Sequence, residues 1–150
     1  MDKIAIASDH GGYDLKKEII CFLEESGYPL QDFGCYNKKS VHYPDYANRV
    51  AEAIITGKYQ LGILVCGTGI GMSIAANKVK GIRASLCHDT FSARMAKEHN
   101  NANILTMGGR VIGSGWAIEI VKTWLNSEFT GEVRHLTRLQ KIESIYLKHQ

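Results

Sequence analysis

Short, continuous runs of apolar residues alternate along this chain with longer stretches in which apolar residues recur every three or four positions. This alternation limits the possible folds more than any other feature. Unbroken apolar runs are typical of strands buried on both faces, and they predict strands at residues 4–8, 30–33, 61–66, 84–87 and 104–107. Helical periodicity predicts helices at residues 13–26, 46–56, 72–78, 90–99, 115–126 and 132–147.

Strands that alternate with helices need crossover connections, which produce parallel pairing. We therefore expect an α/β fold, a doubly wound Rossmann-like sandwich around a five-stranded parallel sheet. The 150 residues contain no linker or internal repeat, so residues 1–150 are expected to form a single domain. The last helix follows a short connection at 127–131 and is half polar, so we expect it to reach a partner subunit rather than cover its own sheet.

Composition excludes several classes of function. The net charge is only +3 and the basic residues form no dense run, which argues against nucleic-acid binding. No apolar run reaches the ~18 residues of a membrane span, and no signal-peptide pattern is present, so a cytoplasmic protein is expected. The four cysteines share no CxxC spacing, so neither a metal site nor a disulfide framework is expected.

Glycine and polar residues follow four of the predicted strands at the point where each strand ends. They are Asp-His-Gly-Gly at 9–12, Cys-Gly-Thr-Gly-Ile-Gly at 66–71, His-Asp at 88–89 and Gly-Gly-Arg at 108–110. Parallel sheets bind ligands beyond the carboxyl ends of their strands. The four clusters together predict a pocket at this edge.

The segment 66–71 is a predicted strand-to-helix turn whose glycines let the backbone approach a ligand and present amide groups to an anion. It lacks the Gly-Lys-Ser/Thr of a P-loop and the Gly-x-Gly-x-x-Gly of dinucleotide sites. A tight structural turn is the simpler alternative. Cys66 stands before the helix N-terminus, whose field favours the reactive thiolate. Thr68 either contacts the ligand or caps the helix.

The other three thiols lack such a setting. Cys21 is expected on the apolar side of a helix, Cys35 in a loop and Cys87 within a strand, each as a small buried residue. His10 and His99 are candidates for acid–base chemistry or phosphate contact, although His99 could equally cap a helix. His42, His88 and His135 are not assigned a chemical role.

Three arginines could hold a phosphate by paired hydrogen bonds, namely Arg110, Arg134 and Arg138. Arg134 and Arg138 are four residues apart and share one helix face. A solvated basic face is the simpler explanation of that spacing. Phosphate binding requires these arginines to line the pocket, whereas a solvated basic face does not.

With these residues assembled, the chain resembles the type B ribose-5-phosphate isomerases, in the family that also contains galactose-6-phosphate isomerase subunits. The resemblance covers essentially the whole chain. It is carried by the motifs Ile-Ala-Ser-Asp-His-Gly-Gly at 6–12, Tyr-Pro-Asp-Tyr at 43–46, Cys-Gly-Thr-Gly-Ile-Gly-Met at 66–72, His-Asn at 99–100 and Met-Gly-Gly-Arg at 107–110.

The resemblance implies a reversible aldose–ketose isomerisation of ribose 5-phosphate and ribulose 5-phosphate through an enediolate, in carbohydrate metabolism, without a metal or cofactor. Cys66 would be the base, Thr68 would contact the reacting oxygens, and Asp9 and His99 would handle the sugar ring and its opening. The residues implied in substrate binding are His10, Tyr43, Gly67, Gly69, Ile70, Gly71, Asn100, Arg110, Arg134 and Arg138.

Two positions distinguish this chain within the family. One branch lacks the cysteine and carries glutamate where Met72 stands, so Cys66 together with Met72 matches the cysteine branch. His42 precedes Tyr43 where an acidic residue is more usual, which concerns the mouth of the site.

The family also implies a homodimer or tetramer whose sites are shared, with His99, Asn100 and Arg110 across the interface from Cys66. Three alternatives stay open from the sequence. They are an isomerase of a six-carbon 6-phosphate such as allose or galactose 6-phosphate, a non-catalytic phosphosugar binder, and a hydrolase with a covalent cysteine intermediate.

Overall fold

The computed structural model describes all residues from 1 to 150. It contains the strands β1 (Ile4–Ser8), β2 (Leu30–Asp32), β3 (Leu61–Cys66), β4 (Ala84–Leu86) and β5 (Ile104–Gly108). Its helices are α1 (Tyr13–Glu25), α2 (Tyr43–Ile55), α3 (Ile70–Ala76), α4 (Thr90–Glu98), α5 (Ser114–Leu125) and α6 (Val133–Lys148). All strand pairs are parallel and the sheet order is β2-β1-β3-β5-β4. The predicted five-stranded parallel α/β fold is confirmed.

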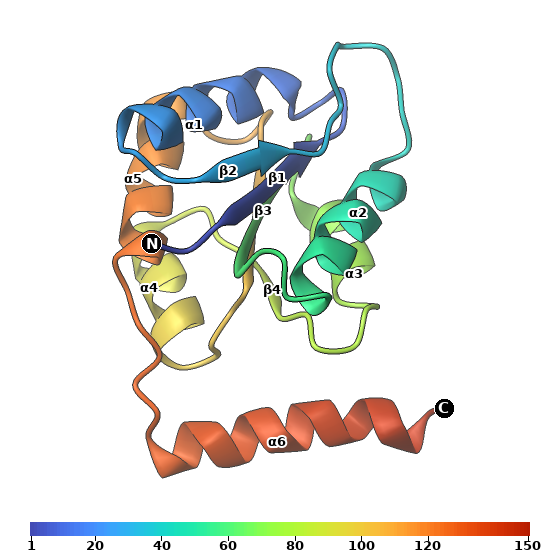
Figure 1. The fold of residues 1–150 in the computed structure, drawn as a ribbon, viewed down its shortest axis with the longest axis vertical. Helices are drawn as coiled ribbons and strands as arrows, with labels where there is room; N and C mark the ends of the chain where they lie inside the picture. The colour runs from blue at the N-terminus through green and yellow to red at the C-terminus, as the bar shows by residue number, and fades with distance from the viewer.

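Helices cover both faces of the sheet (Figure 1). Helices α1, α4 and α5 pack on one face and α2 and α3 on the other, so the sheet separates two apolar cores. The chain runs from β1 outward to β2, and then crosses back to β3 on the other side of β1. The carboxyl ends of β1 and β3 therefore flank the topological switch point, where ligands bind in open sheets of this kind.

Alternation along the central strands explains the two cores. Ile4 and Ile6 of β1 join the core under α1, α4 and α5, whereas Ala5 and Ala7 join the core under α2 and α3. Successive side chains of a strand point to opposite faces. The small alanines let α2 approach the sheet closely through its own alanines, such as Ala47.

Two helices begin before the predicted residue. Helix α2 begins at Tyr43 rather than residue 46, because Pro44 in its first turn lacks only an amide hydrogen that would stay unpaired there. Helix α3 begins at Ile70 rather than residue 72, directly after Gly69 in the left-handed conformation. Helix α3 also ends at Ala76, two residues before the predicted end at 78, and the other boundaries lie within one residue of the prediction.

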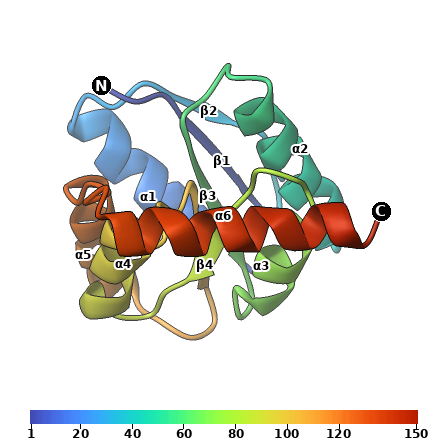
Figure 2. The ribbon, with the colours of Figure 1, turned by 90° about the horizontal axis from the view of Figure 1, so that it is seen from below.

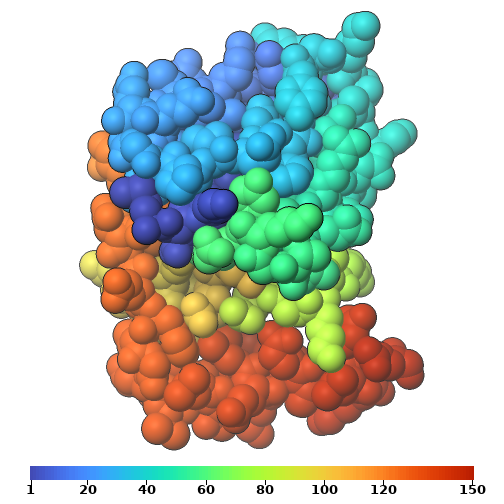
Figure 3. Space-filling view, in the orientation of Figure 1, coloured from blue at the N-terminus to red at the C-terminus, as the bar shows by residue number.

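Helix α6 covers neither face of the sheet. It runs along the outside of the molecule beside β4 (Figures 1 and 2) and forms a separate ridge in the space-filling view (Figure 3). His135 is the only residue of α6 that is buried, and apolar residues including Val133, Ile145 and Leu147 are exposed. No helix of the chain has the length and hydropathy that crossing a membrane requires.

Candidate active site

A cleft of ≈ 410 Å³ opens at the carboxyl ends of β1 and β3. Residues from four predicted motifs line it together, and the lining consists of Asp9, Tyr43, Cys66, Gly67, Thr68, Ile70, Gly71, Ile74 and Arg110. Eight of these nine come from the predicted site; Ile74 was not anticipated, because an exposed apolar residue on a helix carries no distinguishing signal in sequence.

Cys66 is the last residue of β3, and its relative exposure is only 4%. The amide N–H of Gly69 donates a hydrogen bond to its Sγ atom, with a distance of 3.1 Å between nitrogen and sulfur. The cleft therefore holds a sulfur atom that a backbone amide fixes in position.

Gly69 adopts a φ of +78°, which an L side chain rarely takes. A Cβ atom at this position would lie 2.6 Å from Cδ1 of Leu86 and 2.8 Å from the backbone of Met107. The hydroxyl of Thr106 donates to the Gly69 carbonyl at 3.0 Å. Conformation, packing and this hydrogen bond together fix the direction in which the Gly69 amide points at Cys66.

Gly69 is the N-cap of α3, and the Oγ1 atom of Thr68, one residue earlier, accepts a hydrogen bond from the amide of Ile70 at 3.2 Å. This is the capping alternative considered from the sequence. The hydroxyl proton of Thr68 has no acceptor in the chain, so it remains available to a ligand oxygen in the cleft.

Asp9 is buried and shapes the loop after β1. One carboxylate oxygen, Oδ1, accepts hydrogen bonds from the amides of Gly11 and Gly12 at 2.9 and 3.1 Å. The other oxygen, Oδ2, has no hydrogen-bond partner in the chain. Asp9 is thus held in place by one oxygen and can offer the second to a ligand.

His10 follows Asp9 in the same loop. Its Nδ1 atom accepts a hydrogen bond from the amide of Val41 at 3.2 Å, which leaves Nε2 as the donor nitrogen.

Arg110 belongs to the same cleft as Cys66, and the expectation that it lies across a subunit interface is wrong. It follows β5, whose residue Gly108 pairs with Cys66 of β3, so the carboxyl end of β5 lies beside the thiol. A Cβ at Gly11 or at Gly67 would approach the Arg110 side chain to 3.4 Å. The guanidinium forms no salt bridge, so it is a free cation for an anionic ligand.

Tyr43 packs against the start of α3. A Cβ at Gly71 would lie 2.6 Å from Cζ of the Tyr43 ring, so only glycine leaves room for this contact. Tyr43 and Ile70 stand on the rim of the cleft, and both are exposed.

His99 and Asn100 lie at the other end of the sheet. His99 is the C-cap of α4 and precedes β5, whose first residue Ile104 pairs with Gly62 of β3. Four strand residues at about 3.3 Å each, or about 13 Å, separate Gly62 from Cys66. Within one chain the His99 side chain therefore does not meet the thiol. Arg134 and Arg138 of α6 also lie away from the cleft.

His135 stacks on His99, with 4.2 Å between the ring centroids and 17° between the ring planes. Its relative exposure is 4%, and its Nε2 atom has no hydrogen-bond partner. Burial, followed by the charges of His99 and Arg134, lowers the pKa of His135. His135 is not among the site residues predicted from the sequence, because no spacing in the sequence indicates the stack.

The remaining thiols differ from Cys66 in their surroundings. Burial, and to a lesser extent Asp89, raises the pKa of Cys87 to about 11. The expectation that Cys21 is buried is wrong, because position 21 points about 200° away from the buried Ile19. Cys21 donates to the carboxylate of Glu25, which raises its pKa. Cys35 is buried and donates to the carbonyl of Asn37.

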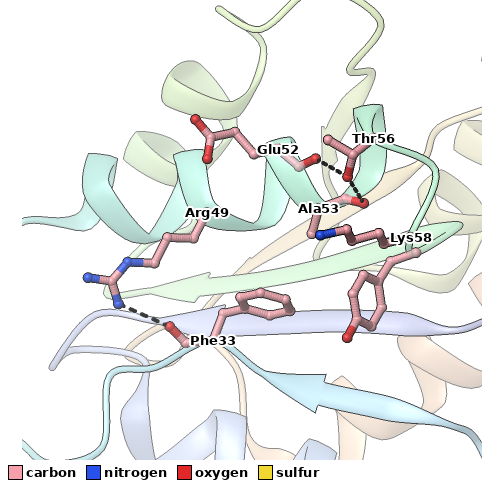
Figure 4. A pocket seen from close by; sticks show the side chains of 7 residues that line it. Phe33, Arg49, Glu52, Ala53, Thr56 and Lys58 are labelled. Carbon is pink, nitrogen blue, oxygen red and sulfur yellow. Dashed lines mark hydrogen bonds between the residues drawn. The ribbon is translucent and has the colours of Figure 1, made fainter.

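A second cavity of ≈ 280 Å³ lies between α2 and the segment after β2 (Figure 4). The ring of Phe33 lies on its floor, and the side chains of Arg49 and Lys58 come from opposite sides. Arg49 donates to the Phe33 carbonyl at 3.3 Å. No cysteine or histidine lines this cavity, so it lacks the thiol chemistry of the cleft. No three His, Cys, Asp or Glu side chains anywhere in the chain are grouped to hold a metal.

Comparison with known proteins places these features in a family. The profile described as ribose/galactose isomerase matches residues 4–142. A putative sugar phosphate isomerase of Bacillus subtilis is 58% identical over 141 residues, covering 93% of this chain and 94% of the relative. A D-erythrulose-4-phosphate isomerase of Pectobacterium atrosepticum is 46% identical over 153 residues, covering 100% and 97%. The solved ribose-5-phosphate isomerase B of Clostridium thermocellum superposes with a TM-score of 0.97 at 54% identity, covering 99% of both chains.

Proposed function

This chain belongs to the ribose/galactose isomerase family, and we propose that it interconverts ribose 5-phosphate and ribulose 5-phosphate as an aldose–ketose isomerase. The observation that carries the proposal is the thiol of Cys66 in the cleft, with the amide of Gly69 as its donor. The whole-chain similarity to a solved ribose-5-phosphate isomerase B supports the choice of a pentose substrate.

In the proposed reaction the Cys66 thiolate removes the proton from C2 of the open-chain aldose. The electron pair moves to the C1 carbonyl and forms an enediolate. The thiol then returns the proton at C1, while the O2 hydroxyl proton is lost and O1 gains one, so that substrate and product have the same atoms. A base and a trap for the oxyanion are the two requirements of this chemistry.

The trap is the turn 67–71. The Gly69 and Ile70 amides already donate to Cys66 and Thr68, so the remaining amides of the turn and the free hydroxyl proton of Thr68 would stabilise the enediolate oxygens. The unpartnered oxygen of Asp9 would bind a sugar hydroxyl. Tyr43 on the rim would contact the substrate from the solvent side.

The rest of the site would come from a second copy of this chain, in a cytoplasmic homodimer. His99, which would assist ring opening, and Asn100 lie about 13 Å or more of strand length from Cys66 in the same chain. Arg134 and Arg138 would join Arg110 and His10 around the phosphate. Ile70 and Ile74 are exposed beside the cleft, with 59% exposure for Ile74, which suits a surface that a partner covers.

A second candidate substrate has four carbons, because the relative from Pectobacterium atrosepticum bears the name D-erythrulose-4-phosphate isomerase at 46% identity. Both substrates would use the same base and oxyanion trap. They differ in the distance between the reacting carbons and the phosphate, so the phosphate-binding residues would decide between them.

The deciding experiment compares initial rates on ribose 5-phosphate, D-erythrulose 4-phosphate, allose 6-phosphate and galactose 6-phosphate. We expect the highest kcat/KM with ribose 5-phosphate. Cys66→Ala should lower it by about a thousandfold, the usual contribution of a positioned base. Cys87→Ala is the matched control, since it removes a buried thiol outside the cleft, and it should keep the wild-type rate. Absence of turnover with all four sugars, together with retained ribose 5-phosphate binding, would instead indicate a non-catalytic binder.

A further inference from the structure

We propose that His135 is a positioning residue, which holds the imidazole of His99 by its flat face so that both nitrogens of His99 stay free for the sugar. The inference rests on the proposed function, in which His99 assists opening of the sugar ring. It assigns a purpose to the one residue of α6 that is buried.

The stack orients His99 in the absence of any hydrogen bond to its ring. Neither ring nitrogen of His99 forms a hydrogen bond within the chain. A histidine that takes a proton at one step and returns it at another needs free nitrogens, so its orientation has to come from packing. The His135 ring, 4.2 Å away and only 17° from parallel, supplies that packing.

His135 is itself firmly placed at the start of α6. Its backbone amide donates to the carbonyl of Glu132 at 2.9 Å, and the amide of Thr130 donates to the carbonyl of Glu98, next to His99, at 3.1 Å. The segment that leads into α6 is thus attached to the end of α4. The two imidazoles are held together by both backbone segments.

The charges around the pair disfavour a proton on His135. His135 faces His99 from α4, Arg134 and Arg138 from its own helix and Glu132 at the helix start. Three of these four groups carry or can acquire positive charge, and His135 is buried with Nε2 unpartnered. Protonating His135 would bury an unpaired charge beside a second imidazole, and burial accordingly lowers the pKa of His135.

The two directions of the reaction separate this role from a structural one. Ribose 5-phosphate is mostly a closed furanose that must open. Ribulose 5-phosphate has no free hydroxyl at C5 and stays open. Misplacing His99 therefore slows initial rates from the aldose, which become limited by unassisted ring opening. Initial rates from the ketose do not depend on that step.

The test measures both directions for His135→Leu and His135→Phe. In His135→Leu the flat face is lost, and we expect initial rates from ribose 5-phosphate to fall by about tenfold or more while rates from ribulose 5-phosphate stay within about twofold. His135→Phe keeps the flat face and should restore the rates from the aldose. The proposal also predicts that the rate from the aldose in His135→Leu stops rising in proportion to enzyme concentration.

Equal losses in both directions, no loss in either, or an equal defect in the Leu and Phe variants would overturn the proposal. His135→Met, which fills a similar volume without a ring, replaces His135→Leu if that variant does not fold. Wild-type protein that turns over neither sugar would contradict the proposed function, whereas every result above concerns His135 in an active isomerase.

Discussion

The cleft around Cys66 and the region around His99 are built in opposite ways. At Cys66 the backbone fixes the geometry, because the amide of Gly69 donates a hydrogen bond to the sulfur. The cleft lies at the ends of strands whose side chains are buried in two cores. At His99 a single ring stack orients the side chain, and the adjoining helix α6 has most of its surface in solvent. Cys66 lies at the carboxyl ends of the parallel strands, whereas His99 lies at their amino ends.

Under the proposed function, this difference means that one chain carries two parts of a site that it cannot bring together. Residues that meet at the carboxyl ends of parallel strands are joined by the fold itself. Residues at the amino ends, such as His99, would reach such a cleft only in a second molecule, as proposed above. A two-fold interface would place each part opposite the other twice.

The largest expected effect tests whether the two regions serve a shared site. Cys66→Ala and His99→Ala chains should each be nearly inactive alone. In a mixed dimer one pocket has both lesions and the other has neither, so random exchange should restore activity to about one quarter of wild type, as two-fold pairing requires. Activity is measured after co-refolding an equal mixture.

The control for this mixture is Cys66→Ala with Cys66→Ser, in which every pocket keeps a lesion and no recovery is expected. If subunit exchange is demonstrated by mass and the Cys66→Ala and His99→Ala mixture stays inactive, each pocket is built from one chain and the comparison fails.

The second effect concerns the cysteines. At pH 8 a pKa of about 11 leaves only about one Cys87 in a thousand as thiolate, so Cys87 should react with iodoacetamide more slowly than Cys66, which lines the open cleft. The fraction of Cys87 present as thiolate increases as the pH approaches its pKa. The rate of Cys87 labelling should therefore rise toward pH 11. Peptide mapping follows each site, and ribose 5-phosphate should protect Cys66 alone. Faster labelling of Cys21 or Cys35 without substrate protection would remove the special status of Cys66.

The third effect tests the rigidity of the cleft. Gly69→Ala should lower the free energy of unfolding by about 3 kcal/mol, through a strained φ and the close approach to Met107 and Leu86. Gly27→Ala is the matched control, because Gly27 has a φ of +76° with open space around it and should cost only about 1 kcal/mol. Denaturant unfolding measures both. Equal losses would mean that packing around Gly69 contributes nothing.

The smallest effect concerns α6. Arg83 and Glu143 form a half-buried ion pair of 3.2 Å between α6 and the segment before β4. Glu143→Gln should lower the unfolding free energy by less than about 1 kcal/mol, which is less than about 4 °C in Tm for a chain of this size. A fall of 10 °C in a thermal scan would show that α6 is an integral part of the domain.

The fold and the cleft were largely predictable from the sequence because both follow from rules that act locally. Continuous apolar runs mark strands such as β1 and β3, and the polar residues after them, such as Asp9 and Cys66, meet because parallel strands end together. The same rule places Arg110 in the cleft, since β5 pairs with β3. The resemblance to the family had indicated the other side of an interface for Arg110, and the strand order corrects it.

The rest depended on distances that no local pattern encodes. The stack of His135 on His99 joins residues 36 positions apart through the path of the chain into α6. Cys21 is exposed because it lies about half a helical turn around α1 from the buried Ile19. The capping role of Thr68 and its free proton became distinguishable only from the position of the Ile70 amide.

The location of α6 outside the sandwich has an evolutionary consequence. Almost every residue of that helix touches solvent, so substitutions there escape the packing constraints that hold the strands and the turn at Gly69. If its arginines contact the far end of the sugar, a lineage could alter which chain length is accepted while the proton-transfer machinery is inherited unchanged. The relatives named for a pentose and for a four-carbon phosphate are the kind of divergence that such a division permits.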